Sequence, residues 1–375
     1  MFNLLPATTA EAAGLRADSL RWMEDFIEGH IAENRYSGAQ VAIARHGQLA
    51  YVRSFGEAAP GLRTADSTPF LLYSNTKVIT ASLIWAMVER GLLTFSDRVS
   101  DIVPEFAKHN KQDVTIMHLL THQGGFPNVD GYHDVPIEAY RDHKILRDVV
   151  CDFSLQWAPG SRVEYHHNAA HWTLVVVVEA IMGKDFRQVM RELIFEPLGL
   201  ENELLMGVPD ELADTVASML MPGPDGTLVK HEDDNPDRRR AGVPAGGCFG
   251  SARAMVTFYQ ALLNGGAIGG RRILGPKMIE FALRDRTGGR VVQPMGKPRA
   301  FGIGPFTHGD SYPGVGFGPS ASPETFGHTG GNSSACWGDP NTGVSFAYTT
   351  NTRIDSPWDR RRNELLGGIV QSAII

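Results

Sequence analysis

Apolar residues recur at helical spacing in several segments of the chain. Leu15, Leu20, Met23, Phe26 and Ile27 lie near one face of a helix predicted over residues 10–33. The same spacing predicts helices over residues 74–90, 115–120, 169–182, 186–195, 251–264 and 357–372. Gly91 follows one of these segments, and glycine most easily takes the left-handed conformation with which many helices end.

Short apolar runs bounded by turn residues predict strands near both ends of the chain. Residues 39–45 and 49–53, with His46-Gly47 between them, form a predicted hairpin. Further strands are predicted over residues 300–305, 324–328, 335–338 and 344–349, whereas the middle of the chain is mostly helical. We therefore expect an α/β (α+β) fold, in which an antiparallel sheet built from both chain ends is flanked by helices.

The length of the chain favours two parts, because 375 residues are many for one hydrophobic core. We expect residues 1–91 and 240–375 to form the sheet domain. Residues 92–239 would form a mostly helical inserted domain. The active site is expected at the interface between the two domains, where ligand sites often lie.

Charge narrows the classes of partner. The chain has 35 Lys and Arg against 42 Asp and Glu, a formal net charge of −7 without a basic stripe, so we expect no nucleic-acid partner. The basic cluster Arg238–Arg240 follows several acidic residues, and we interpret this mixture as a solvated loop. The apolar run over residues 174–181 is too short to span a membrane, so no membrane partner is expected.

The cysteines and the first residues bear on location. Cys151, Cys248 and Cys336 lie far apart, are odd in number and lack metal-type spacing, which predicts free thiols in a reducing compartment. The N-terminal residues lack the basic and apolar regions of a signal peptide. These features predict a cytoplasmic protein, and nothing in the sequence implies a cofactor or an oligomeric state.

The tetrad Ser74-Asn75-Thr76-Lys77 is the first candidate for chemistry. Ser74 and Lys77 are three residues apart at the start of a predicted helix, which places them on one face. A serine hydroxyl is a poor nucleophile until a base takes its proton, and a lysine amine is such a base when burial lowers its pKa. Taken alone, such a tetrad is common by chance and more often holds a helix-capping serine and a solvated lysine.

Five further segments follow the tetrad along the chain. They are His118 to Gly125, Pro159-Gly160 with Tyr165, Ile194 to Leu200, Ala245 to Ser251, and His328-Thr329-Gly330. Together and in this order, they resemble the motifs of the serine β-lactamase-like, or penicillin-binding-protein-like, superfamily. That superfamily includes class C β-lactamases, DD-peptidases and family VIII carboxylesterases. The matches extend from about residue 73 to residue 330 and so cover most of the chain.

The resemblance implies a serine hydrolase that works through an acyl-enzyme, and it assigns roles to residues. Ser74 would be the nucleophile, Lys77 its activating partner, and Tyr165 the tyrosine that exchanges protons with both. The backbone N–H groups of Ser74 and Gly331 would form the oxyanion hole. His328, Thr329 and Gly330 would form the strand that borders the site and would contact the substrate.

One motif departs from the family pattern. Where the family has Tyr-Ser-Asn, this chain has Tyr165-His166-His167-Asn168. Counting from Pro159-Gly160 selects Tyr165, whereas counting back from Glu179 places His166 at the position of the tyrosine. We favour Tyr165 because the nearer anchor is less exposed to insertions. His166, His167 and Asn168 are kept as substrate-binding candidates.

The residue at position 328 indicates the substrate class. In the family a lysine often stands there, and a permanent cation would bind a substrate carboxylate. His328 removes that charge, so we expect a carboxylesterase that acts on small or medium esters. The alternatives are a β-lactamase, DD-peptidase or D-amino-acid amidase, and a catalytically weak scaffold or binding protein. His167 and His171 are four residues apart but lack a convincing third ligand, so no metal site is expected.

Overall fold

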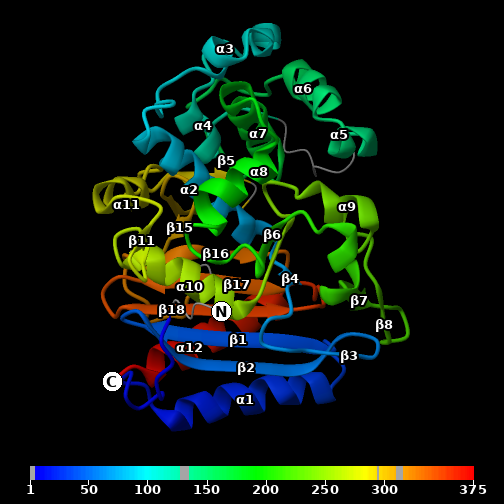
Figure 1. The fold of residues 1–375 in the computed structure, drawn as a ribbon, viewed down its shortest axis with the longest axis vertical. Coiled ribbons are helices and arrows are strands. Elements are labelled where there is room, and N and C mark those ends of the chain that lie inside the picture. The colour runs from blue at the N-terminus through cyan, green and yellow to red at the C-terminus, as the bar shows by residue number, and fades with distance from the viewer. Residues whose placement is uncertain (1–4, 127–134, 294, 310–315) are drawn as a thin grey trace.

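An eight-stranded antiparallel sheet forms the centre of the computed structural model, which describes residues 5–126, 135–293, 295–309 and 316–375 (Figure 1). Strand β1 pairs with β18 on one side and with β2 on the other, so both chain ends contribute to one sheet and the expected fold class is confirmed. In spatial order the strands are β14 (Ala300–Phe301), β15 (Phe306–Thr307), β16 (Phe326–Gly330), β17 (Ser334–Asp339), β18 (Val344–Thr350), β1 (Gly38–Arg45), β2 (Gln48–Ala59) and β3 (Leu62–Arg63).

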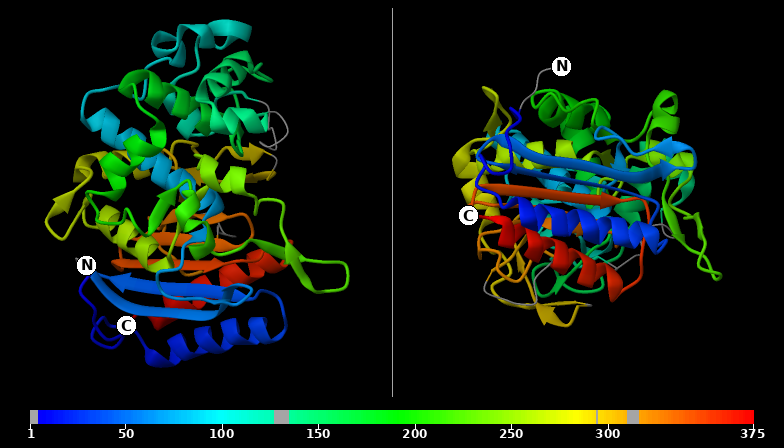
Figure 2. Two further views of the ribbon diagram at one scale, coloured as in Figure 1. Left: turned by 45° about the vertical axis from the view of Figure 1, so that its right-hand side comes forward. Right: turned by 90° about the horizontal axis from the view of Figure 1, so that it is seen from below.

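Both faces of the sheet are covered by helices. Successive side chains of a strand point to opposite faces, so Val41 and Ile43 enter one core cluster while Ala42 and Ala44 enter another. Two helices lie side by side on the first face (Figure 2), and a third covers the second face. They are α1 (Ala17–Ala32) and α12 (Trp358–Ala373) on the first face, and α10 (Ala252–Leu263) on the second.

The other helices lie mostly beyond the β14–β16 side of the sheet (Figure 1). Helix α2 (Thr76–Glu89) is central among them, and every residue from Thr76 to Met87 is buried. The remainder are α3 (Val99–Ile102), α4 (Ile116–Leu120), α5 (Ile137–Arg141), α6 (His143–Asp152), α7 (Ala169–Met182), α8 (Phe186–Met190), α9 (Pro236–Ala241) and α11 (Pro276–Leu283). The division into two domains near residues 91 and 240 stays a prediction.

Four short sheets connect these parts of the fold. One of them, β13-β12-β5, pairs residues near 163 with residues near 292, and so brings the middle of the chain against its C-terminal third. The short strands are β4 (Phe70–Leu71), β5 (Val163–Glu164), β6 (Leu204–Met206), β7 (Leu220–Pro222), β8 (Leu228–Lys230), β9 (Cys248–Gly250), β10 (Ala267–Ile268), β11 (Arg271–Arg272), β12 (Val291–Gln293) and β13 (Lys297–Pro298).

Two predicted elements are shorter in the structure. The first helix begins at Ala17 rather than near residue 10, because Gly14 adopts a φ of 70° and interrupts the chain before it. The strand expected over residues 300–305 is a hairpin of β14 and β15. Gly304 has a φ of 118° in its turn, and a Cβ there would lie 2.3 Å from the Cβ of Ala81 in α2. The turn therefore needs glycine to approach α2.

The cluster Arg238–Arg240 is not a solvated loop, so that interpretation is wrong. The three arginines lie on α9, whose N-terminus is capped by the side chain of Asn235. Arg238 pairs with Asp233, and Arg239 pairs with Asp234; the side chains of the two aspartates are only 4% and 2% exposed. A buried carboxylate needs such a partner, which explains why the arginines follow the aspartates in this segment.

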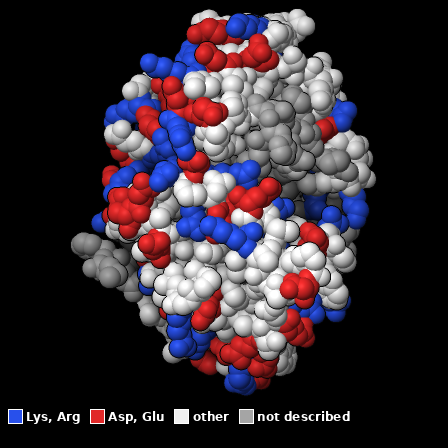
Figure 3. Space-filling view, turned by 90° about the vertical axis from the view of Figure 1, so that its right-hand side faces the viewer, with Lys and Arg blue, Asp and Glu red and all other residues white. Residues whose placement is uncertain are grey.

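Surface and cysteine features bear on the remaining expectations. Acidic and basic side chains are interspersed over the face shown in Figure 3. No helix in the described residues combines the length and the apolarity that crossing a membrane requires. Cys151, Cys248 and Cys336 are buried free thiols, as predicted. The cytoplasmic location stays a prediction.

Candidate active site

Ser74 lies in a tight turn that leads directly into α2. The turn, Tyr73–Asn75, is a single 3₁₀ turn in which Tyr73 has a φ of 45°, an uncommon value for a residue with a side chain. The Nδ2 of Asn75 donates hydrogen bonds to the carbonyl of Leu72 (3.2 Å) and to the Oγ of Ser334 in β17 (2.9 Å). These bonds fix the turn against the sheet and leave Ser74 half-buried.

Lys77 is 1% exposed and lies one turn along α2 from Ser74. Its Nζ is 3.2 Å from the Oγ of Ser74, 2.8 Å from the carbonyl oxygen of His167 and 3.0 Å from that of Ala245. Burial lowers the pKa of Lys77 from 10.5 to about 7, because a desolvated ammonium is less stable than a desolvated amine. Near neutral pH, the neutral amine is therefore a substantial fraction of this lysine.

Hydrogen bonds hold the segment Pro244–Cys248 against α2, and this places the carbonyl of Ala245 beside Lys77. Thr80 donates from Oγ1 to the carbonyl of Pro244 (2.7 Å), and the N–H of Cys248 donates to the Oγ1 of Thr76 (3.1 Å). The sequence singled out this segment only as a family motif. A backbone carbonyl has no side-chain signature, so its part in the site could not be recognised there.

Tyr165 directly follows β5, and its side chain reaches Ser74. Its hydroxyl donates to the Oγ of Ser74 at 3.0 Å, and its ring centre lies 5.1 Å from the Nζ of Lys77. Its ring stacks at 6.1 Å on Phe306, and its N–H donates to the carbonyl of Gln293 in β12. Burial raises the pKa of Tyr165 above its ordinary value, so the phenol keeps its proton.

The three residues after Tyr165 take different positions. His166 is fully buried among aromatic rings, 6.1 Å from Trp157 and 5.6 Å from Phe126, and its N–H donates to the Nδ1 of His122. The exposed His167 has its ring 5.3 Å from the ring of Tyr165. Asn168 is buried at the start of α7, where its carbonyl accepts intrahelical bonds. The structure therefore brings the ring of His167 toward the site and turns that of His166 into the core.

His328 lies beside the catalytic candidates on β16. Its Nδ1 donates to the carbonyl of Thr329 at 2.5 Å, and its ring lies 4.1 Å from Phe306 and 5.9 Å from Tyr165. Burial, and then the nearby charge of Lys77, lower the pKa of His328 to about 3. The imidazole is therefore neutral at physiological pH. Thr329 is the half-buried residue beside it on β16.

Gly330 and Gly331 lie directly against the turn that holds Ser74. A Cβ added at Gly330 would lie 2.2 Å from the carbonyl oxygen of Leu72, and one at Gly331 would lie 2.4 Å from the Cγ of Tyr73. Gly331 also adopts a φ of 43°, which disfavours any residue with a side chain. Only glycine allows β16 to approach the turn this closely.

Three residues of types that often bind metal ions lie close together away from Ser74. Ligand atoms of His143, Glu179 and Asp185 lie within 4.8 Å of one another. The Nδ1 of His143 is 2.6 Å from the Oε1 of Glu179, which also accepts the N–H of Phe186, and Asp185 pairs with Arg187. The carboxylates are thus occupied by protein donors, and the group links α6, α7 and α8.

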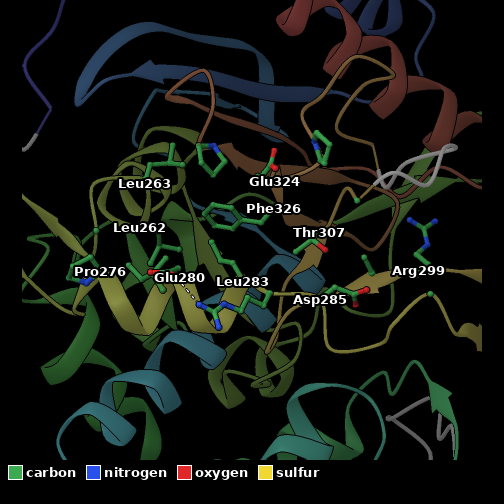
Figure 4. A pocket seen from close by; sticks show the side chains of 18 residues that line it. Leu262, Leu263, Pro276, Glu280, Leu283, Asp285, Arg299, Thr307, Glu324 and Phe326 are labelled. Atoms are coloured by element: carbon green, nitrogen blue, oxygen red, sulfur yellow. Dashed lines mark hydrogen bonds and ion pairs between the residues drawn. The ribbon is translucent and has the colours of Figure 1, made fainter.

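A cavity of about 730 Å³ lies apart from these residues, between α10, α11 and strands β14 to β16 (Figure 4). Its walls include Leu262, Leu283 and Phe326, with Thr307 on β15. None of its lining residues is Ser74, Lys77 or Tyr165, so its size does not make it the site of the chemistry. Thr307 lines the cavity, whereas the ring of its neighbour Phe306 contacts His328. Neighbouring residues of a strand point to opposite faces, so these two side chains lie on opposite faces of β15.

The architecture is that of the serine hydrolases with the β-lactamase fold. The family model described as Beta-lactamase matches residues 23–369, and the chain belongs to this family. The resemblance that the motifs indicated is therefore confirmed.

Three relatives illustrate the range of activities in the family. "Esterase/beta-lactamase LipL" of Mycobacterium tuberculosis is 28% identical over 327 residues, which are 78% of this chain and 71% of that protein. A penicillin-binding protein homologue from Caulobacter crescentus is 26% identical with a TM-score of 0.80 and covers 96% of this chain and 99% of its own. A family VIII carboxylesterase is 25% identical with a TM-score of 0.81 and the same two coverages.

Proposed function

We propose that this protein is a carboxylesterase that hydrolyses small or medium uncharged esters through an acyl-enzyme on Ser74. The observation that carries the proposal is the environment of Lys77. A neutral primary amine has two N–H donors and one lone pair. The carbonyls of His167 and Ala245 accept the two N–H bonds, which leaves the lone pair for the hydroxyl of Ser74.

Acylation begins with the transfer of the Ser74 proton to Lys77. The Oγ of Ser74 then forms a bond to the carbonyl carbon of the ester, and the carbonyl oxygen becomes an oxyanion. The N–H groups of Ser74 and Gly331 stabilise that oxyanion, and each such donor typically contributes about 100- to 1,000-fold in rate. The close contact of Gly331 with Tyr73, the neighbour of Ser74, supports this pairing.

Tyr165 protonates the leaving alkoxide. Its hydroxyl is 3.0 Å from the Oγ of Ser74, and its raised pKa keeps the proton available for donation. Lys77, now an ammonium, returns a proton to Tyr165. The alcohol leaves, and Ser74 carries the acyl group.

Deacylation repeats these steps with water in place of the serine hydroxyl. Lys77, neutral again, accepts a proton from the water that attacks the acyl carbon. The bond between the acyl carbon and the Oγ of Ser74 breaks, Ser74 recovers its proton, and the carboxylic acid leaves. No cofactor takes part in these reaction steps.

The neutral state of His328 supports an uncharged substrate. Its pKa of about 3 means that position 328 carries no cation to bind a carboxylate. The name of the relative from Mycobacterium tuberculosis includes esterase activity, and a family VIII carboxylesterase shares the fold.

A β-lactamase or DD-peptidase is the second candidate, and one observation favours it. The guanidinium of Arg299 lies 5.5 Å over the ring of Phe306, which also contacts the rings of His328 and Tyr165. A cation at that distance is able to attract a carboxylate-bearing substrate into the same site. The name of the Mycobacterium tuberculosis relative also includes β-lactamase activity.

The comparison of chromogenic substrates separates the two candidates. We expect p-nitrophenyl acetate and butyrate to be hydrolysed with a kcat/KM well above that of nitrocefin. Ser74→Ala provides the blank for uncatalysed hydrolysis. A higher kcat/KM for nitrocefin, lost in Arg299→Gln, would instead support the second candidate.

A further inference from the structure

Tyr73, the residue before Ser74, is held by contacts from three separate parts of the chain. Its hydroxyl donates to the Oδ2 of Asp233 at 2.8 Å. The guanidinium carbon of Arg353 lies 5.6 Å over its ring. Gly331 packs against the same ring so closely that a Cβ there would lie within 2.4 to 2.7 Å of three ring carbons.

Asp233 is itself fixed from several sides. Its side chain is 4% exposed and forms an ion pair with Arg238 on α9. Its Oδ2 lies 3.6 Å from the NH1 of Arg353 and 3.3 Å from the Nδ1 of His231, which also accepts the N–H of Asp233. The carboxylate that receives the Tyr73 hydroxyl is therefore part of a rigid, buried network.

The backbone connects this network to the proposed oxyanion hole. The N–H of Ser74 belongs to the planar peptide unit that joins Tyr73 to Ser74, so the conformation of Tyr73 sets its direction. Tyr73 holds a φ of 45°, which a residue with a side chain adopts only when its surroundings impose it. Gly331, which carries the second N–H, rests on the Tyr73 ring.

We propose that Asp233 is a positioning residue for the oxyanion hole. Through the hydroxyl of Tyr73, it fixes the direction of the Ser74 N–H and the place of Gly331 relative to it. This inference rests on the proposed function of Ser74 as the nucleophile. It assigns a role in catalysis to a residue that does not touch the substrate.

Asp234 offers a matched control. It is the next residue, its side chain is 2% exposed, and it pairs with Arg239 on the same helix. Its other cation is Lys230, at 3.5 Å, on β8. Asp233→Ala and Asp234→Ala therefore each remove a buried ion pair with α9, but only the first removes the acceptor of the Tyr73 hydroxyl.

The test compares the two variants in kinetics and in the binding of phenylboronic acid. This boronic acid forms a tetrahedral adduct with a serine Oγ and so reports on the geometry of the oxyanion hole without turnover. For Asp233→Ala we expect kcat on p-nitrophenyl butyrate to fall by about 10- to 100-fold, and the Kd of the boronic acid to rise in parallel. KM should change by less than about 3-fold, because the N–H donors of the oxyanion hole stabilise the transition state far more than the bound ester.

Asp234→Ala should retain the wild-type kcat and boronic acid Kd within about 2-fold. Tyr73→Phe keeps the ring against Gly331 and loses only the hydroxyl, so it tests the same bond if Asp233→Ala does not fold. It should show the same parallel loss, with the midpoint of the pH profile at its wild-type value, since Lys77 keeps its partners.

Two results would overturn the inference. One is an equal loss of kcat in Asp233→Ala and Asp234→Ala, which would make the effect one of general stability. The other is a boronic acid Kd in Tyr73→Phe within about 2-fold of wild type. A wild-type protein that binds the boronic acid but hydrolyses no ester would contradict the proposed function alone, and the comparison of Kd values would still test Asp233.

Discussion

Changing the pH tests the proposed base directly, because its activity depends on one proton. Burial lowers the pKa of Lys77 from 10.5 to about 7. Only the neutral amine accepts the Ser74 proton, so kcat/KM should rise with pH and reach half of its plateau near pH 7. At pH 5, two units below this pKa, about 1% of the enzyme carries the neutral amine, and kcat/KM should be about 1% of the plateau. An unperturbed lysine would place the midpoint at 10.5 instead.

Other groups near Ser74 should leave this profile undisturbed. Burial lowers the pKa values of His166 and His328 to about 3, so both rings are neutral across the range. Burial raises the pKa of Tyr165 above its ordinary value, so the phenol keeps its proton up to at least pH 9. We therefore expect a single rising limb with a slope of one and then a plateau.

The assay is the initial rate of p-nitrophenyl butyrate hydrolysis below KM, between pH 5 and 9, read at the isosbestic wavelength of p-nitrophenol. His167→Asn is the control, because the bond to Lys77 is made by the backbone carbonyl of His167, which the substitution keeps. This variant should keep the midpoint of the wild type. A profile that is flat between pH 6 and 8, or a midpoint that moves in His167→Asn, would refute the assignment of Lys77 as the base.

Three substitutions extend the test to the rest of the site. Tyr165→Phe keeps the stacking on Phe306 but loses the proton donor, so kcat should fall by about 100-fold or more, and a near wild-type kcat would contradict its role. Gly331→Ala places a Cβ 2.4 Å from the Tyr73 ring, so both kcat and Tm should fall; unchanged kinetics would show that this contact does not shape the site. His328→Lys should raise the ratio of nitrocefin to p-nitrophenyl butyrate turnover by about 10-fold, and a constant ratio would remove the charge argument for esters.

Local spacing explains why much of the site could be predicted from the sequence. Ser74 and Lys77 are separated by one helical turn, and Tyr165 lies only a few residues from Pro159-Gly160. The structure brings their polar atoms within 3.2 Å of the Oγ of Ser74. The choice of Tyr165 over His166 depended on which anchor was counted, and the two side chains point in different directions in the structure.

The partners that the sequence did not reveal are distant or carry no side-chain signal. Asp233 is 160 positions from Tyr73, and its acidic neighbours made the segment look solvated. Backbone carbonyls such as that of Ala245 have no residue type to recognise.

Mass spectrometry after treatment with a fluorophosphonate tests the central claim most directly. The reagent phosphonylates an activated serine, and the modified residue is identified by digestion of the labelled protein. We expect one adduct, on Ser74, that is lost in Ser74→Ala and forms much more slowly in Lys77→Ala, which lacks the base. An adduct on another residue, or no adduct on folded wild-type protein, would contradict the assignment of Ser74 as the nucleophile.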